Sequence, residues 1–160
     1  MACTAPLPQK LHALVQPPGA AGTWPARGPA APVTAGSRVL VVDDNEDAAA
    51  TLAMLLELSG YRTRTARDGL QALQIAREFE PQIGLLDIGL PFIDGRELAR
   101  RLRQGPDGAR LVLVALSGWG QALDREASAS AGFDAHLVKP VDPQVLMDLL
   151  AVLMARRARE

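Results

Sequence analysis

Short apolar runs alternate with segments of helical periodicity from Arg38 to the end of the chain, and this alternation constrains the fold more than any other feature. Apolar or β-branched runs of a few residues are typical of buried strands, whereas apolar residues three or four positions apart are typical of helices. The expected strands are residues 39–42, 61–66, 83–86, 111–116 and 135–138. The expected helices start at Asp44 or Asn45 and end before Gly60, then run from Asp68 to about Phe79, from Asp94 to Arg103, from Gln121 to Ala131 and from Asp142 to the C-terminal arginines. Five strands alternating with five helices predict a parallel sheet with right-handed crossovers.

Two doubly wound α/β arrangements place such a sheet between helices on both faces. One is the five-stranded flavodoxin-like order 2-1-3-4-5, and the other is half of a Rossmann fold. Residues 39–42 are continuously apolar, which predicts a strand buried on both faces. Residues 61–66 instead alternate, with Arg62 and Arg64 facing away from Tyr61, which predicts an edge strand.

The first 36 residues differ in composition from the rest of the chain. They contain seven of the twelve prolines, nine alanines and four glycines, and they contain no Asp or Glu. A segment of this composition cannot keep a helical or strand period for long. We therefore predict a disordered tail over residues 1–36 and one folded domain over residues 37–160.

The composition excludes several classes of function. A single cysteine rules out an internal disulfide framework and a cysteine-built metal site, and two histidines are too few for an imidazole-rich metal centre. The formal net charge of −1 gives no reason to expect binding to nucleic acid or to an anionic membrane surface. No run of about 18 apolar residues occurs, so no segment is expected to span a membrane. We expect a soluble cytoplasmic protein.

Polar side chains follow four of the expected strands at the point where each strand ends. They are Asp43 and Asp44 after the first strand, Asp87 after the third, Ser117 after the fourth and Lys139 after the fifth. Ligands of open α/β sheets bind at this edge, where the strand order reverses. In the order 2-1-3-4-5 the first and third strands are neighbours, so three carboxylates converge there and repel one another unless a cation lies among them. Mg²⁺, which prefers hard oxygen ligands, and the ammonium of Lys139 would meet that need.

Four short motifs occur in order, each at the end of a strand. They are Asp-Asp at 43–44, Asp-x-x-x-Pro at 87–91, Ser-Gly at 117–118 and Lys-Pro at 139–140, and Asp94-Gly95 and the segment Gly-Phe-Asp-Ala-His-Leu-Val-Lys-Pro at 132–140 extend the pattern. Together they resemble the receiver domains of response regulators in bacterial two-component systems, which are CheY-like and have the flavodoxin-like fold. The resemblance covers nearly all of the expected folded domain.

The resemblance implies a role for each of these residues. Asp87 would be the phosphoacceptor, because a carboxylate can act as the nucleophile in phosphoryl transfer. The implied Mg²⁺ ligands are Asp43, Asp44, Asp87 and the backbone carbonyl of Gly89. Ser117 and Lys139 would contact the phosphoryl group, and the Lys139–Pro140 bond would be cis.

The resemblance also implies partners. The phosphoryl donor would be a sensor histidine kinase or a histidine phosphotransfer protein, and phosphorylation would change the affinity for a downstream protein that the sequence does not identify. Because the chain ends after the last expected helix, we expect a stand-alone receiver. We do not expect an enzyme that turns over a separate substrate.

One position departs from the family pattern. Receiver domains usually have Tyr or Phe three residues before the lysine, where this chain has His136. An imidazole can still swing toward Ser117 and donate a hydrogen bond, but its charge and hydration differ from those of a phenol. A pH-sensitive or weakened switch is therefore a hypothesis for this chain. Gly89 and Trp119 occupy positions that, by the same resemblance, tune the lifetime of the phosphoryl group.

Other functions fit the sequence less well. An unphosphorylated receiver-like binding module is one alternative, although the complete set of site residues argues against it. A phosphatase of the haloacid-dehalogenase type would need Asp-x-Asp after the first strand, where this chain has Asp43-Asp44-Asn45. The phosphate-binding motif of P-loop NTPases and the glycine motif of dinucleotide-binding folds are both absent from the sequence.

Overall fold

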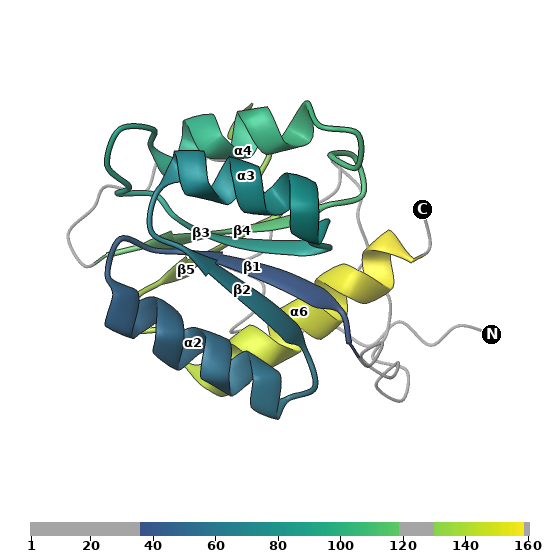
Figure 1. The fold of residues 1–160 in the computed structure, drawn as a ribbon. Coiled ribbons are helices and arrows are strands. Elements are labelled where there is room, and N and C mark those ends of the chain that lie inside the picture. The colour runs from purple at the N-terminus through teal and green to yellow at the C-terminus, as the bar shows by residue number, and fades with distance from the viewer. Residues whose placement is uncertain (1–35, 119–129, 159–160) are drawn as a thin grey trace.

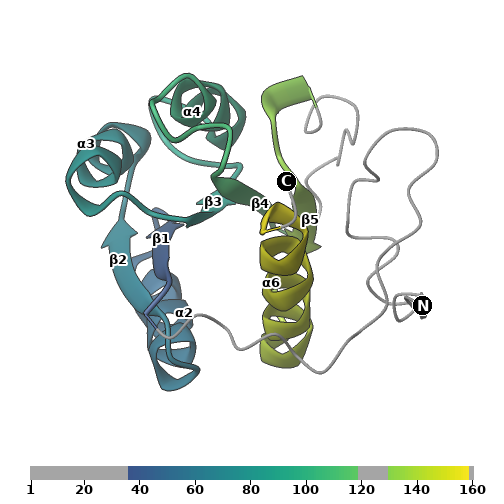
Figure 2. The same cartoon turned by 90° about the vertical axis from the view of Figure 1, so that its right-hand side faces the viewer.

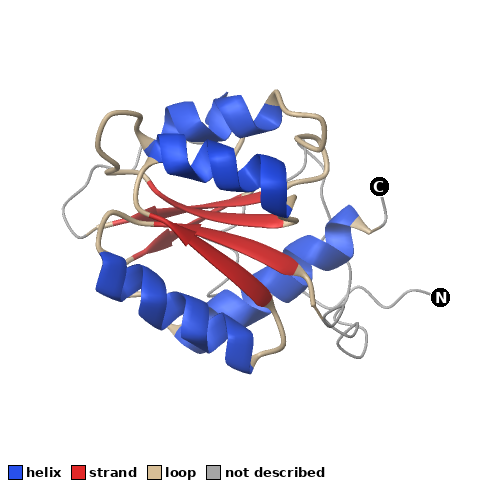
Figure 3. Ribbon diagram, viewed as in Figure 1, coloured by secondary structure: helices blue, strands red, loops and turns tan. Residues whose placement is uncertain are grey.

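A five-stranded parallel sheet lies between two layers of helices in the computed structural model, which describes residues 36–118 and 130–158 (Figures 1 and 3). The strands are β1 (Arg38–Val42), β2 (Arg62–Ala66), β3 (Ile83–Asp87), β4 (Val112–Ser117) and β5 (Ala135–Val138). They lie in the order β2-β1-β3-β4-β5. The flavodoxin-like order is therefore confirmed, and the half-Rossmann alternative is wrong.

The helices agree with the expected ranges to within a few residues. They are α2 (Glu46–Leu58), α3 (Gly69–Phe79), α4 (Gly95–Arg103) and α6 (Pro143–Arg157). β2 lies at an edge of the sheet, as its alternating sequence predicted. The expected helix from Gln121 to Ala131 falls almost entirely outside the described residues, and so do Trp119 and the predicted tail up to residue 35.

Each face of the sheet packs against its own pair of helices, as the turned view shows clearly (Figure 2). Successive side chains of a strand point to opposite faces. Val39 and Val41 of β1 accordingly join a core with α2 and α6, whereas Leu40 and Val42 join a second core with α3 and α4. Because four of the five β1 residues are fully buried, β1 lies at the centre of the hydrophobic core.

A side-chain cap fixes the start of each of these four helices. Asn45 accepts a hydrogen bond from the Ala48 N–H at the start of α2, and Asp68, Asp94 and Asp142 cap α3, α4 and α6 in the same manner. These caps satisfy backbone N–H groups that have no partner within the helix. In a parallel α/β sheet each of these helix starts follows the carboxyl end of a strand, so the caps also shape the edge where the polar residues gather.

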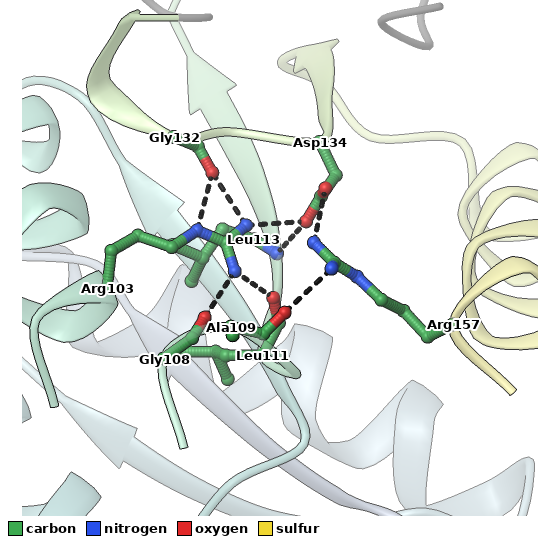
Figure 4. A network of polar contacts seen from close by, with 8 residues as sticks. All are labelled: Arg103, Gly108, Ala109, Leu111, Leu113, Gly132, Asp134 and Arg157. Carbon is green, nitrogen blue, oxygen red and sulfur yellow. Dashed lines mark hydrogen bonds and ion pairs between the residues drawn. The ribbon is translucent and has the colours of Figure 1, made fainter. Parts of the chain in front are cut away.

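Arg103 organises a network of polar contacts at the end of the sheet where β4 and β5 begin, opposite the strand ends that carry the acidic residues (Figure 4). The guanidinium of Arg103, at the end of α4, donates to the carbonyls of Gly108, Leu111 and Gly132 and to the carboxylate of Asp134. These contacts use all five of its N–H donors. The other oxygen of Asp134 accepts from Arg157 of α6 at 2.8 Å. The network ties α4, α6 and the N-terminal ends of β4 and β5 into one unit.

Candidate functional site

Three carboxylates converge at the carboxyl ends of β1 and β3. The two strands pair directly, with Val42 opposite Leu86, so Asp43 after β1 and Asp87 at the end of β3 become neighbours. One carboxylate oxygen from each of Asp43, Asp44 and Asp87 lies within 4.8 Å of the other two. The expectation that the three acids share one crevice is confirmed.

The ammonium of Lys139 lies between two of these acids. Its Nζ is 2.6 Å from Asp43 Oδ2 and 3.2 Å from Asp87 Oδ2. Lys139 directly follows Val138, the last residue of β5, and its backbone N–H donates to the Ser117 carbonyl at 2.7 Å. The lysine therefore reaches across β4 to the acids, and the cluster of three carboxylates and one ammonium has a net charge of −2 when all four groups are ionised.

Backbone N–H groups hold the other oxygens of the two buried acids. Asp43 Oδ1 accepts from the N–H of Asn45 at 2.9 Å, and Asp87 Oδ1 accepts from the N–H of Gly89 at 2.9 Å. Each carboxylate is thus fixed between a backbone donor two residues further on and the lysine. Sequence reasoning missed these donors because any residue except proline supplies a backbone N–H; only the local backbone conformation aims it.

Burial and charge act against each other at this cluster. Burial raises the pKa of the Asp87 carboxyl above its ordinary value, and the Gly89 N–H and the Lys139 ammonium reduce that rise only in part. Burial alone would lower the pKa of Lys139, but its contacts with Asp43 and Asp87 outweigh that effect and raise it. The protein therefore keeps the lysine charged and leaves the negative charge of Asp87 only partly compensated.

These residues fit a divalent cation. The ligands that three carboxylates offer are hard oxygens, which Mg²⁺ prefers. Asp43 and Asp87 are buried, whereas Asp44 is exposed, so the cluster lies at the surface with one side open to solvent. The cluster of three carboxylates and one ammonium also keeps a net charge of −2 when all four groups are ionised, which a divalent cation would neutralise.

Ser117 lies at the same strand ends as this cluster and shares one face of the sheet with His136. Ser117 ends β4, and His136 of β5 pairs with Ala115, two residues before Ser117 on the same strand. Both side chains are buried, at 1% and 7% exposure. The Ser117 hydroxyl has no hydrogen-bond partner among the residues that the structure describes. A buried hydroxyl that lacks a partner here is available to a ligand in the crevice.

The loop from Ile88 to Asp94 folds back onto the end of β3. The Gly95 N–H donates to the Ile88 carbonyl at 3.1 Å. A Cβ at Gly95 would lie 2.4 Å from the Asp87 carbonyl oxygen, which is closer than any side chain allows. Position 95 therefore has to be glycine for the loop to close. The Lys139–Pro140 bond is cis, as the family resemblance implied.

Residues 39–151 match the model of the response regulator receiver domain family. The chain is 39% identical over 120 residues to the transcriptional regulatory protein PrrA of Mycobacterium tuberculosis, a match that covers 75% of this chain and 51% of PrrA. It is 34% identical over 103 residues to the polar-differentiation response regulator DivK of Brucella anthropi, covering 64% of this chain and 84% of DivK. The chain thus spans only about half the length of PrrA and most of the length of DivK.

A solved structure agrees with this assignment. The CheY-like receiver domain protein of Methanospirillum hungatei JF-1 superposes with a TM-score of 0.71 at 25% identity, over 78% of this chain and 98% of that one. The chain belongs to the response regulator receiver domain family. Domains of this family are signalling phosphoacceptors of two-component phosphorelays rather than conventional enzymes, and they typically bind Mg²⁺ at an acidic cluster. Within the described ranges, none of the helices combines the length and apolar character needed to cross a membrane.

Proposed function

We propose that Asp87 accepts a phosphoryl group from a sensor histidine kinase or a histidine phosphotransfer protein, and that phosphorylation switches binding to a downstream protein. The observation that supports this most directly is the group of three acids within 4.8 Å of one another, with the Lys139 ammonium between Asp43 and Asp87. A structural role alone would not require so many like charges in one crevice.

The proposed chemistry is a displacement at phosphorus. An oxygen of the Asp87 carboxylate attacks the phosphorus of a phosphohistidine, the P–N bond breaks, and its electron pair leaves with the imidazole nitrogen, which takes up a proton. The product is an aspartyl phosphate on Asp87. The Gly89 N–H holds one carboxylate oxygen, so it orients the other toward the donor.

Three groups of this chain would stabilise the charge on the transferred group. Lys139 already contacts Asp87 and would move onto a phosphoryl oxygen, and the hydroxyl of Ser117, which has no partner among the described residues, would donate to another. Asp43, Asp44, Asp87 and the Gly89 carbonyl would hold Mg²⁺, which supplies positive charge to the phosphoryl oxygens. Positioning and charge neutralisation are most of what catalysis of phosphoryl transfer needs.

Switching would follow from the movement of Ser117 toward the phosphoryl group. His136 lies on the same sheet face and would turn toward the space that Ser117 leaves, changing the surface around β5. Such a change is a population shift between two states of the domain. Since the phosphoryl of histidine kinases comes from ATP, the proposal includes a cytoplasmic location.

Intact-protein mass spectrometry after incubation with acetyl phosphate and Mg²⁺ tests the proposal. We expect the wild type to gain one phosphoryl group and Asp87→Asn to gain none. Asp142→Asn is a matched control, because asparagine can also cap α6 and residue 142 lies outside the acidic cluster. An unlabelled wild type would favour a receiver-like module that binds without phosphorylation, and equal labelling of Asp87→Asn would assign the acceptor to another residue.

A further inference from the structure

Phe92, in the loop between β3 and α4, has two unfavourable features at once. Its φ of 66° lies in the left-handed region, which glycine adopts readily and in which a bulky residue is an outlier. Its side chain is 91% exposed, so the ring gains nothing from burial within the domain. Strained residues of this kind are concentrated at functional sites and ligand contacts. The ring would therefore gain contacts only from a partner outside the domain.

The position of Phe92 is fixed relative to the proposed acceptor. The loop from Ile88 to Asp94 begins and ends on the acceptor strand, because Gly95 packs against the backbone of Asp87 and Ile88. Three residues of extended chain span at most about 11 Å, so the Phe92 Cα lies within about 11 Å of Gly95. The exposed ring is thus anchored close to the backbone of Asp87.

A protein donor has to cover the surface around Asp87 when it delivers its phosphoryl group. Even a small, transient interface buries about 600 Å² on each partner, which corresponds to a disc of about 14 Å radius. The phosphohistidine must reach Asp87 itself, so an interface of this radius is wide enough to extend onto the adjoining loop that carries Phe92. Aromatic residues, phenylalanine among them, are enriched at the core of protein–protein interfaces relative to the rest of the surface.

The surroundings of Phe92 define the chemistry of the partner surface. Gly69 at the start of α3 packs against Ile93, the residue after Phe92, and Leu70, the residue after Gly69, is also an exposed apolar residue, at 59%. The exposed residues around the crevice include four acids, Asp44, Glu46, Asp47 and Asp94, and one of them, Glu46, is paired at 4.0 Å with the exposed Arg67. A complementary surface has an apolar patch beside its phosphohistidine and basic groups around both.

We infer that Phe92 is a specificity-determining contact for the phosphohistidine-bearing donor protein. This inference rests on the proposed function, since it takes Asp87 as the acceptor. Phe92 has no part in the chemistry: it touches neither the acidic cluster nor Lys139 in any described contact. A small donor such as acetyl phosphate has no surface to place on the ring, so its reaction is independent of residue 92.

Phosphotransfer from two kinds of donor tests the inference. The protein donor is a purified histidine phosphotransfer protein, phosphorylated on histidine and chosen because it labels the wild type; the small donor is acetyl phosphate. Phe92→Asn removes the ring and suits a left-handed backbone, and Phe92→Tyr keeps the ring. Leu58→Asn is the matched control, because Leu58 is also an exposed apolar residue, at 81%, but lies about 18 Å along α2 from its start near the crevice.

We expect Phe92→Asn to lower the second-order rate constant of phosphotransfer from the protein donor by about tenfold or more, as truncation of a dominant interface contact does. Labelling by acetyl phosphate should be unchanged, the melting temperature should not fall, and Phe92→Tyr and Leu58→Asn should behave as the wild type. Unchanged transfer from the protein donor to Phe92→Asn would overturn the inference, and so would an equal loss with both donors. If the proposed function itself were wrong, acetyl phosphate would not label the wild type at Asp87. That result can be told apart from a failure of the inference about Phe92.

Discussion

The Asp87 carboxylate is held by groups that orient it more than they neutralise it. One oxygen accepts from the Gly89 N–H and the other from Lys139, which shares its charge with Asp43. Burial still dominates and raises the pKa of Asp87. The carboxylate is therefore held in one orientation, and its environment disfavours the negative charge. Both properties suit a nucleophile that works beside an added cation.

Ser117 allows the proposed function to be separated from stability. Its buried hydroxyl lacks a described partner, so Ser117→Ala removes a desolvated polar group and should leave the free energy of unfolding unchanged or raise it by up to about 1 kcal/mol. Loss of a donor to the phosphoryl group should slow labelling by acetyl phosphate on the order of tenfold to a hundredfold. Urea denaturation and labelling rates check both expectations, with Ser59→Ala, an exposed serine at the end of α2, as the control. A destabilised variant that is labelled at the wild-type rate would show that the hydroxyl is structural.

Tyr61 predicts how the fold responds to alkaline pH. It is the only tyrosine of the chain and is 4% exposed, and burial raises the pKa of its phenol above the ordinary 10.0. Because the folded state binds the phenolic proton more tightly than the unfolded state does, this contribution to stability is complete below pH 10 and is lost as the pH rises through the folded-state pKa. We expect the ultraviolet absorbance of tyrosinate to titrate with a midpoint above that of a free tyrosine.

The same linkage gives Tyr61→Phe a distinct signature. A phenylalanine at this position has no proton to lose, so the variant should lose less stability than the wild type above pH 10. Denaturation at neutral and alkaline pH measures the difference. Parallel pH profiles for the two proteins would show that other groups, such as Lys139, control alkaline unfolding.

Among the helices, α4 connects the end of the sheet that carries the acidic cluster with the opposite end, where the strands begin. Asp94 caps its start beside the crevice, and Arg103 at its end organises the network at the opposite edge (Figure 4). The position of the helix thus depends on polar contacts at both ends as well as on the apolar packing of Leu98 and Leu102.

Arg103→Gln should destabilise the fold by about 3 kcal/mol, because the change leaves buried carbonyls and part of the Asp134 carboxylate without their donor. Chemical denaturation measures the effect. Arg101→Gln is the control, since Arg101 pairs with the exposed Glu97 and should change stability little. Labelling of the folded Arg103→Gln protein by acetyl phosphate should stay at the wild-type rate, because the network lies at the far edge from Asp87. A slow rate would show that the two edges are coupled.

At the scale of the whole molecule, the acidic cluster predicts that Mg²⁺ stabilises the fold. A ligand that binds only the native state at ten times its Kd adds about 1.4 kcal/mol, which raises the melting temperature by a few degrees. Thermal denaturation in EDTA and in increasing Mg²⁺ measures this shift. Asp44→Asn should reduce it and Asp142→Asn should not. Equal melting temperatures at all Mg²⁺ concentrations would contradict a cation site at the acids.

The boundary near residue 36 and the stand-alone character of the receiver stay predictions, as do the Gly89 carbonyl ligand and the His136 switch. Removal of residues 1–35, which keeps Gly36 and its hydrogen bond to the Gly60 carbonyl, should leave the melting temperature and the labelling of Asp87 unchanged if the removed residues form no part of the fold. A large fall in the melting temperature would place them in the domain.

Local patterns in the sequence were enough to predict the helices and strands and the functional groups that they carry. Apolar periodicity is a local property, so it predicted the described strands and helices to within a few residues, and the caps Asp94 and Asp142 were visible as residue types. The same reasoning put Asp43, Asp87 and Lys139 at strand ends, since each directly follows or closes an apolar run.

Which of these strand ends meet depends on the order of the strands in the folded sheet. Pairing of parallel strands is a long-range choice made by burial of the whole core, and two sheet orders fitted the local pattern; only the order β2-β1-β3-β4-β5 brings Asp43 beside Asp87. Three further features also depend on how distant segments pack. They are the directions of the Asn45 and Gly89 N–H groups, the hydrogen bonds of Arg103 and the left-handed backbone of Phe92. Backbone direction is set by the packing around it, which no single stretch of residues encodes.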